Sequence, residues 1–321
     1  MRRDERIQDS GSRIQHGDSK PGLWTALLAV LLAAGCAAPK AQFTDVDWVS
    51  HATTGRGAYE RGDYRRAADA YGRAQERARA LDDADALAVA AVNRAVCLLA
   101  DGQAKEALAG VREAVADGRV AEDRQTELQV VGARASLALG KPDEALASLA
   151  VVLKSNPPVL LRAQALLTEA AVHLAGNDPA AASKALLSGL SEKAWAGLPA
   201  SIRAERAERL GRIATAQERP RDAVAPWDEA SRLWKKANRL PEMARALAEA
   251  GRQAKASGDL AGACDRFYRA ARSLWAQEIL AEAARTLEEG VSCAEQLEDE
   301  AVAKRMAELL VTFKNGERLS K

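Results

Sequence analysis

The residue types that most often carry acid–base, nucleophilic or metal chemistry are few in this chain of 321 residues and lie far apart. The three histidines are His16, His51 and His173, and none stands in a grouping of serine, cysteine or carboxylates typical of a catalytic triad or a metal site. The sequence also has no glycine-rich loop of the kind that cradles phosphates. We therefore expect a protein that is not an enzyme, with no cofactor, no metal and no small-molecule substrate.

The four cysteines divide into two kinds. Cys97, Cys264 and Cys293 stand among alanines, leucines and valines in helical stretches, where a free cysteine serves as a small hydrophobic residue. Because three is an odd number, no disulfide framework is implied. Cys264 and Cys293 lie on consecutive expected helices and could form one bond, so the sequence leaves their state open. Cys36 has a different setting.

Cys36 lies near the end of an apolar run that covers residues 23–38. The run is shorter than the roughly 20 residues of a membrane span and has the length of a signal-peptide core. Its sequence Leu32-Ala33-Ala34-Gly35-Cys36 resembles the bacterial lipobox. The resemblance implies that residues 1–35 are a cleaved lipoprotein signal peptide, and that residues 36–44 are a tether lipidated at Cys36. A short uncleaved anchor helix is the alternative.

Lipidation would also decide where the protein resides. Several acyl chains on one cysteine anchor a protein stably to a membrane. Ala37 and Ala38 follow Cys36, and the lack of an aspartate there resembles lipoproteins sorted to the outer membrane. We expect an outer-membrane lipoprotein of the bacterial cell envelope that faces the periplasm and contacts the membrane through Cys36.

The charge of the chain is balanced. Lys and Arg number 46 and Asp and Glu 45, and the predicted leader removes five basic and four acidic residues, which leaves no net charge. This balance argues against nucleic acid as a partner, since phosphate binding needs a basic excess. Four arginines follow one expected helix, but Glu205 and Glu208 precede Arg209 and Arg212 by four residues. This spacing favours a solvated salt-bridge face over a binding patch.

A small sequence unit recurs along the chain. Six alanines follow one another at steps of 36 to 42 residues, and five of them have a glycine five residues upstream. The alanines are Ala67, Ala107, Ala145, Ala181, Ala223 and Ala263, and the glycines are Gly62, Gly102, Gly140, Gly176 and Gly258. The pattern continues at the fourth and seventh residues after each alanine, which is one helical face. Each unit is therefore predicted to be a helix, a tight turn and a second helix.

The small positions of these units resemble those of a known repeat. Gly55, Ala67 and Ala74 in the first unit match the small-residue positions of the tetratricopeptide repeat (TPR). Gly251, Ala263 and Ala270 match them in the sixth unit. The resemblance implies an all-α fold, an α-α superhelix or solenoid of about six to seven TPR-like helix pairs, over residues 45–314, followed by a tail at 315–321. Extra length at residues 188–199 predicts a bend.

In the resemblance, the first helices of the units line a concave groove that binds protein partners. The expected groove residues are apolar in units two to four, with one arginine and one histidine, and charged in units five and six. The first set is Val89, Val92, Val96, Leu99, Val130, Arg134, Leu137, Leu166, Ala170 and His173. The second set is Glu205, Glu208, Arg212, Arg245, Arg252 and Lys255. The apolar half would hold an apolar helix or tail of a partner; alternatively, those residues are core, because the first helix of unit two is apolar almost all round.

These features together predict a lipid-anchored, periplasm-facing scaffold or assembly factor for an envelope complex. Secretin pilotins and components of the outer-membrane assembly machine have this general build. The alternative is a regulator of a peptidoglycan synthase or hydrolase that binds through the same surface. No motif in the sequence selects between them.

Overall fold

The computed structural model describes residues 43–315, and this part of the chain forms fifteen helices. The predicted leader, Cys36 and most of the tether and the tail lie outside the described residues. The bounds are α2 (Val46–Glu60), α3 (Tyr64–Ala80), α4 (Ala84–Ala100), α5 (Ala104–Val115), α6 (Glu122–Ala138), α7 (Pro142–Lys154), α8 (Val159–Ala175), α9 (Pro179–Ser188), α10 (Glu192–Ala196), α11 (Ala200–Ala216), α12 (Pro220–Lys236), α13 (Leu240–Ala256), α14 (Leu260–Ala276), α15 (Leu280–Gln296) and α16 (Glu300–Asn315).

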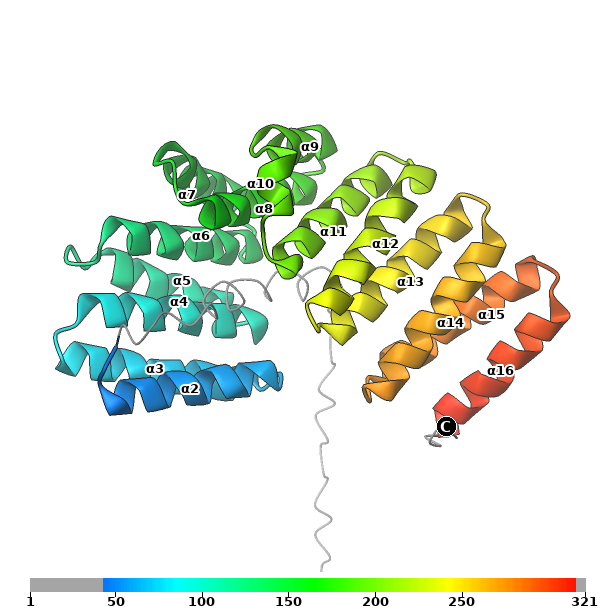
Figure 1. Cartoon of the computed structure of the whole chain (residues 1–321), viewed down its shortest axis with the longest axis horizontal. Helices are drawn as coiled ribbons and strands as arrows, with labels where there is room; N and C mark the ends of the chain where they lie inside the picture. Colours follow the sequence, from blue (N-terminus) through cyan, green and yellow to red (C-terminus); the bar gives the residue numbers. More distant parts are fainter. Residues whose placement is uncertain (1–42, 316–321) are drawn as a thin grey trace, which may run out of the picture.

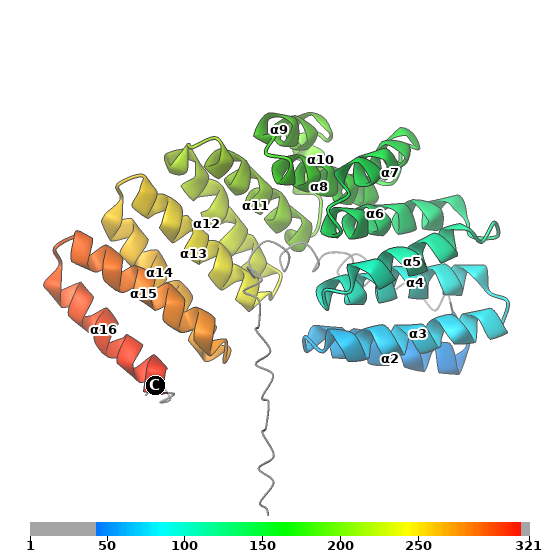
Figure 2. The same cartoon turned by 180° about the vertical axis from the view of Figure 1, so that it is seen from behind.

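The helices pack in seven consecutive pairs that curve into an arch (Figures 1 and 2). Helices α2 to α7 form one arm, α11 to α16 form the other, and α8 to α10 lie at the crown. The five-residue helix α10 lies between the fourth and fifth pairs, within the stretch whose extra length predicted a bend. The prediction of an all-α solenoid of six to seven helix pairs is confirmed.

The turns between helices follow one backbone rule. Gly62, Gly102, Gly140 and Gly258 each have a positive φ of 70° to 88° directly before the next helix. Glycine suits this left-handed conformation because it has no Cβ. Gly176 does not use it, since the next residue, Asn177, has the positive φ there instead.

Close helix contacts explain the other small residues of the repeat. A Cβ added at Gly55 would lie 2.7 Å from the ring of Tyr71, and one at Gly211 would lie 2.7 Å from the indole of Trp227. Each glycine stands on the first helix of a pair and each ring on the second. The small residue therefore lets the two backbones approach around a bulky knob, as the repeat pattern predicts.

The buried core consists of several clusters along the arch. Among the described residues, the largest of these clusters lies in the first arm, around α3 to α6. None of the helices in the described part of the chain has both the length and the apolar character to cross a membrane.

Candidate binding surface

The apolar residues expected in the groove are mostly buried. Val92, Val96 and Leu99 are 1–7% exposed and belong to one core cluster of the first arm. Val130, Leu137, Leu166 and Ala170 are 0–4% exposed and pack in neighbouring clusters. Their placement corrects the expectation of an apolar binding surface, since such side chains offer no area to a partner and fit the alternative in which they are core. Half-buried Val89 packs against the core cluster that contains Trp48, and His173 is half-buried near the end of α8.

The charged residues of α11 are also buried, which corrects the expectation of a solvated salt-bridge face. Glu205, Glu208 and Arg209 are only 1%, 3% and 2% exposed. The reason is the position of α11, which packs against α8, α9 and α12 at the bend and so has few open sides. The spacing of these charged residues correctly predicted that they share one helix. It could not indicate which neighbouring helices cover them.

These side chains join polar residues of other helices in one group, which we call the central polar cluster. It consists of Arg134, Gln164, Thr168, Glu205, Glu208, Arg209 and Glu242, from α6, α8, α11 and α13. Arg134 Nε donates to Thr168 Oγ1 at 3.1 Å, and the Thr168 hydroxyl donates to the backbone carbonyl of Gln164 at 2.8 Å. Trp234 Nε1 donates to Glu208 Oε1 at 2.7 Å. The cluster therefore connects helices of both arms.

Tyr59, near the end of α2, lies close enough to this cluster for electrostatic interaction. Burial raises the pKa of its phenol, and Arg239 and Glu242 of the opposite arm act on the same group. Arg134 in turn interacts electrostatically with Glu205 and Tyr59. The cluster thus includes residues of both arms, whose helix ends face each other on the inner side of the arch (Figure 1).

Burial dominates the electrostatics of the cluster. It raises the pKa of Glu205 to about 7, against the opposing effect of Arg134 and Arg209. It also raises the pKa of Glu208 and lowers that of Arg209 to about 10. These directions follow from the cost of a charge in a low-dielectric interior. The shifts of Glu205 and Arg209 both oppose charge, but a pKa of about 10 still leaves Arg209 protonated at neutral pH.

Several hydrogen-bonding groups of the cluster have no hydrogen-bond partner among residues 43–315. The donors are Gln164 Nε2 and Arg209 Nε and Nη2, and the acceptors are Glu205 Oε1, Glu208 Oε2 and Glu242 Oε2. A buried polar group without a hydrogen bond costs about 1–3 kcal/mol. Because these atoms are buried, a ligand that supplies both donors and acceptors could reach them only if the helices around them move apart.

The remaining predicted groove residues are engaged in pairs. The guanidinium of Arg212 lies 5.7 Å from the ring centroid of Trp227. Arg245 binds Glu282 at 2.9 Å. Arg252 Nε binds Glu289 at 2.7 Å and its Nη1 binds Glu249, while Lys255 Nζ donates to Ser292 at 3.5 Å. The pairs with Glu282, Glu289 and Ser292 tie α13 to α15, so they serve the packing of consecutive units.

Sequence reasoning missed Gln164, Thr168, Tyr59 and Glu242 as members of this region. A signal for two of them is present, because Gln164 and Thr168 are four residues apart in a mainly apolar helix and therefore share one face. No comparable signal marks Tyr59 or Glu242, which reach the cluster through the curvature of the arch.

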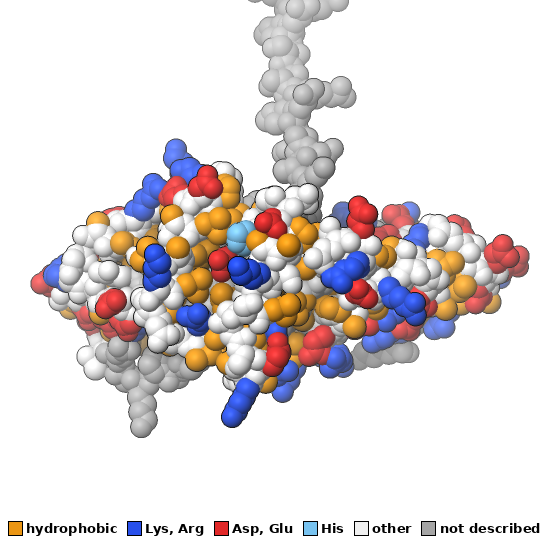
Figure 3. All heavy atoms as spheres, turned by 90° about the horizontal axis from the view of Figure 1, so that it is seen from above, with side chains coloured by type: hydrophobic (Ala, Val, Ile, Leu, Met, Phe, Trp, Pro, Cys, Tyr) orange, Lys and Arg blue, Asp and Glu red, His pale blue; other side chains and the backbone are white. Residues whose placement is uncertain are grey.

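The outer face of the crown has a different character. Seen from above, it carries hydrophobic side chains interspersed with charges of both signs (Figure 3). Val151, Val159 and Leu187, on α7, α8 and α9, are 49–56% exposed. This face shows no continuous basic area of the kind that phosphate backbones require.

No family model and no curated protein matches the chain. Solved structures do match it in fold. A Rap protein complexed with Competence and Sporulation Factor is 16% identical, with a TM-score of 0.56, over 86% of this chain and 77% of that one. The apo form of RapI is 13% identical, with a TM-score of 0.54, over 84% of this chain and 98% of that one.

A signal transduction ATPase with a tetratricopeptide-repeat sensor, from Pyrococcus horikoshii, is 14% identical with a TM-score of 0.56. The match covers 78% of this chain and 41% of that one, so it spans less than half of the ATPase. The helix pairs, their small-residue contacts and these likenesses together show that the chain has the tetratricopeptide-repeat fold.

Proposed function

We propose that this protein is a non-enzymatic interaction scaffold whose helices move apart around the central polar cluster to hold an extended segment of a protein partner there. The observation that carries the proposal is the set of buried, unpartnered donors and acceptors on α8, α11 and α13. The Rap protein with the same fold is described in complex with Competence and Sporulation Factor, which supports a binding role for an arch of this kind.

The unpartnered groups favour an extended segment over a helix. A helix satisfies its backbone N–H and C=O groups internally, so it could offer the cluster only side chains. An extended chain presents free N–H groups to Glu205 and Glu208 and free carbonyls to Gln164 and Arg209. The proposed partner segment therefore differs from the apolar helix or tail that was one of the two interpretations of the sequence pattern.

The proposal extends to the cell envelope through the lipobox resemblance at Cys36. A chain anchored there would act as an assembly factor of the secretin-pilotin or outer-membrane assembly type. Palmitate labelling of the protein and of a Cys36→Ala variant tests the anchor. Labelling that depends on Cys36 supports it, and an unlabelled protein that retains its leader contradicts it.

Partner capture tests the binding site. Gln164→Leu removes an unpartnered donor without leaving a new buried charge, so we expect normal circular dichroism and about a tenfold loss of partner capture from solubilised envelope. Gln217→Leu, at the C-cap of α11, is the matched control and should capture normally. Recovery of a secretin or barrel protein supports the assembly role, whereas recovery of a peptidoglycan enzyme replaces it with a regulatory one. Equal capture by both variants overturns the site.

A further inference from the structure

Two of the buried cysteines come from consecutive helices of the second arm. Cys264 lies one turn into α14, and Cys293 lies one turn before the end of α15. A tight turn joins these helices, so they run antiparallel and the start of α14 lies beside the end of α15 (Figure 1). Both residues belong to one core cluster and are only 4% and 0% exposed. Cys97 lies in α4 of the first arm, in another cluster.

The thiols of Cys264 and Cys293 are in contact. The Cys293 thiol donates to the Leu260 carbonyl at 3.4 Å, and Leu260 lies one helical turn before Cys264, on the same face of α14. The Cys264 thiol in turn donates to the Cys293 sulfur, and burial and this hydrogen bond raise the pKa of Cys264 to about 12. Helix packing therefore holds the two sulfurs side by side, as a disulfide between neighbouring helices requires.

A bond between these residues would cross a boundary between helix pairs. Cys264 belongs to the sixth pair, α13 and α14, and Cys293 belongs to the seventh, α15 and α16. In a repeat array the end unit contacts only one neighbour, and α16 has only two buried residues, Met306 and Phe313. The bond would close a loop of about 30 residues and so restrict chiefly the states in which the last pair has left the arch.

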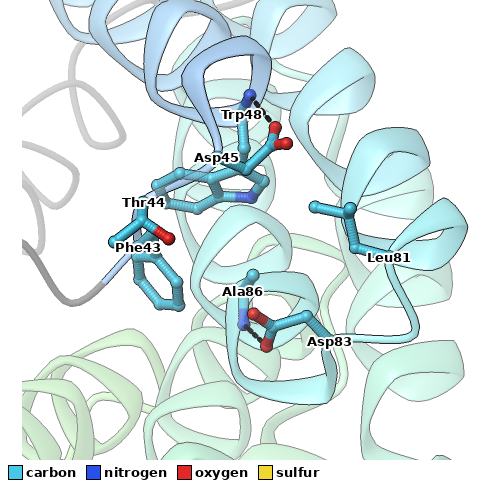
Figure 4. Close-up of a pocket in the computed structure, with 7 residues that line it drawn as sticks. All are labelled: Phe43, Thr44, Asp45, Trp48, Leu81, Asp83 and Ala86. Atoms are coloured by element: carbon cyan, nitrogen blue, oxygen red, sulfur yellow. Dashed lines mark hydrogen bonds between the residues drawn. The ribbon is translucent and has the colours of Figure 1, made fainter.

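The first end of the arch is secured without cysteines. At the start of α2, Asp45 accepts from the Trp48 backbone N–H at 2.9 Å (Figure 4). The same carboxylate accepts from Arg77 of α3 at 2.7 and 2.9 Å, so an ion pair joins both helices of the first pair. Helix α2 also has four buried residues, twice as many as α16. The cysteine pair therefore lies near the end of the arch that noncovalent contacts hold less firmly.

We propose that Cys264 and Cys293 are a redox-sensitive pair, and that the disulfide between them fastens the last helix pair to the rest of the arch. The oxidant is the disulfide of another thiol compound, such as oxidised glutathione. One cysteine thiolate attacks this disulfide and releases one thiol, and the second cysteine then displaces the other thiol from the mixed disulfide. The chain gives up two protons and two electrons, and the oxidant becomes two thiols. The pair is independent of the central polar cluster.

Oxidation of the pair depends on access to the sulfurs. Because both thiols are covered by neighbouring helices, the folded chain should react slowly. The oxidant reaches them while the chain is still folding, or when the last helix pair opens locally. When α15 packs against α14 again, the neighbouring position of the second thiol favours the bond within the chain over the mixed disulfide.

Refolding of the full chain from urea in a glutathione redox buffer tests the pair. A Cys36→Ala background leaves Cys97, Cys264 and Cys293 as the only cysteines. Free thiols are then trapped in urea with N-ethylmaleimide, and the chain is digested with trypsin. Mass spectrometry should find peptides 256–266 and 286–304 joined in most molecules, with Cys97 trapped as a thiol. Cys97→Ala is the matched control and should leave the yield of this bond unchanged.

The oxidised chain should also open less readily at its last helix pair. We expect amide hydrogen exchange in α15 to be at least about tenfold slower than in the reduced chain, while exchange in α2 and α3 at the other end stays the same. Trapped Cys264 and Cys293 after refolding, or bonds that include Cys97 as often as the expected one, overturn the pair. Equal or faster exchange of α15 in the oxidised chain overturns its fastening role.

Discussion

At the scale of single residues, the unusual feature of the chain is a set of polar side chains that are buried. Glu205 and Arg209 are almost fully covered, and their pKa values shift in the directions that oppose charge. Natural cores rarely keep such groups without hydrogen bonds. Their presence on the inner side of the arch is the main reason to assign binding to that region.

Glu205 makes stability depend on pH in a defined window. Its pKa is about 7 in the folded chain and 4.5 for an ordinary glutamate, so between these values the folded state binds more protons than the unfolded state. Stability should therefore fall as pH rises from 4.5 to 7 and then level off. Glu205→Gln should remove on the order of 3 kcal/mol of this decline, as measured by urea unfolding across the window. An unchanged pH profile in the variant would contradict the prediction.

The three thiols of the repeat domain are free in the structure. Burial raises the pKa of Cys97 to about 12 and is the main cause of an equal value for Cys264, and the Cys293 thiol donates to the Leu260 carbonyl at 3.4 Å. A thiol is unreactive while it is protonated and buried. We expect Ellman's reagent to modify all three only after unfolding; rapid reaction of the native domain would contradict this.

At the scale of elements, the sequence predicted the helix pairs and turns better than it predicted which side chains are exposed. The glycines and alanines place the turns and helix pairs because local backbone strain and close packing select them directly. The facing of side chains was harder to predict: Val92 and Glu205 occupy expected groove positions, yet both are covered by neighbouring helices. Which side chains become covered depends on the angle between successive helix pairs. At α10 the only sign of the bend in the sequence is the extra length of this stretch.

Helix pairing makes Gly211 sensitive to added volume. Gly211→Ala would place a Cβ 2.7 Å from Trp227 Nε1, so we expect a loss of about 1–3 kcal/mol in the free energy of unfolding. Gly110 in α5 is the matched control, because its Cβ would meet nothing within 4 Å. Gly110→Ala should instead stabilise the domain by about 0.5–1 kcal/mol. Equal effects of the two changes would exclude the knob contact as the cause.

Two opposite substitutions at turn positions with a positive φ test whether residues other than glycine are strained there. Glu218 has a φ of 56° at the turn position that glycine fills in other units, and a non-glycine residue there costs about 1–2 kcal/mol. Glu218→Gly should stabilise the domain by about 0.5–1 kcal/mol. Gly102→Ala, with φ 79° and open space around its Cβ, should destabilise it by a similar amount. Thermal unfolding of both variants measures the two signs, and the same sign in both would refute the strain argument.

At the scale of the whole molecule, stability should vary along the arch. In a repeat array each unit contacts only its neighbours, so the end units are supported on one side. In the last helix, α16, only Met306 and Phe313 are buried, whereas nine residues of α13 are. Amide hydrogen exchange should therefore be fastest in α16 and slowest in α11 to α13. Uniform protection would indicate that the arch unfolds as one unit.

The meeting of the two arms near Tyr59 and Arg239 has a consequence for how such a chain can evolve. An open array can gain or lose a duplicated unit and keep all its neighbour contacts. Here one added pair between α4 and α13 would displace one arm relative to the other and separate Tyr59 from Arg239 and Glu242. Gene duplication within this segment would thus break the contact between the two arms, so the number of units between its two sides is fixed by geometry even where the individual repeats are free to diverge.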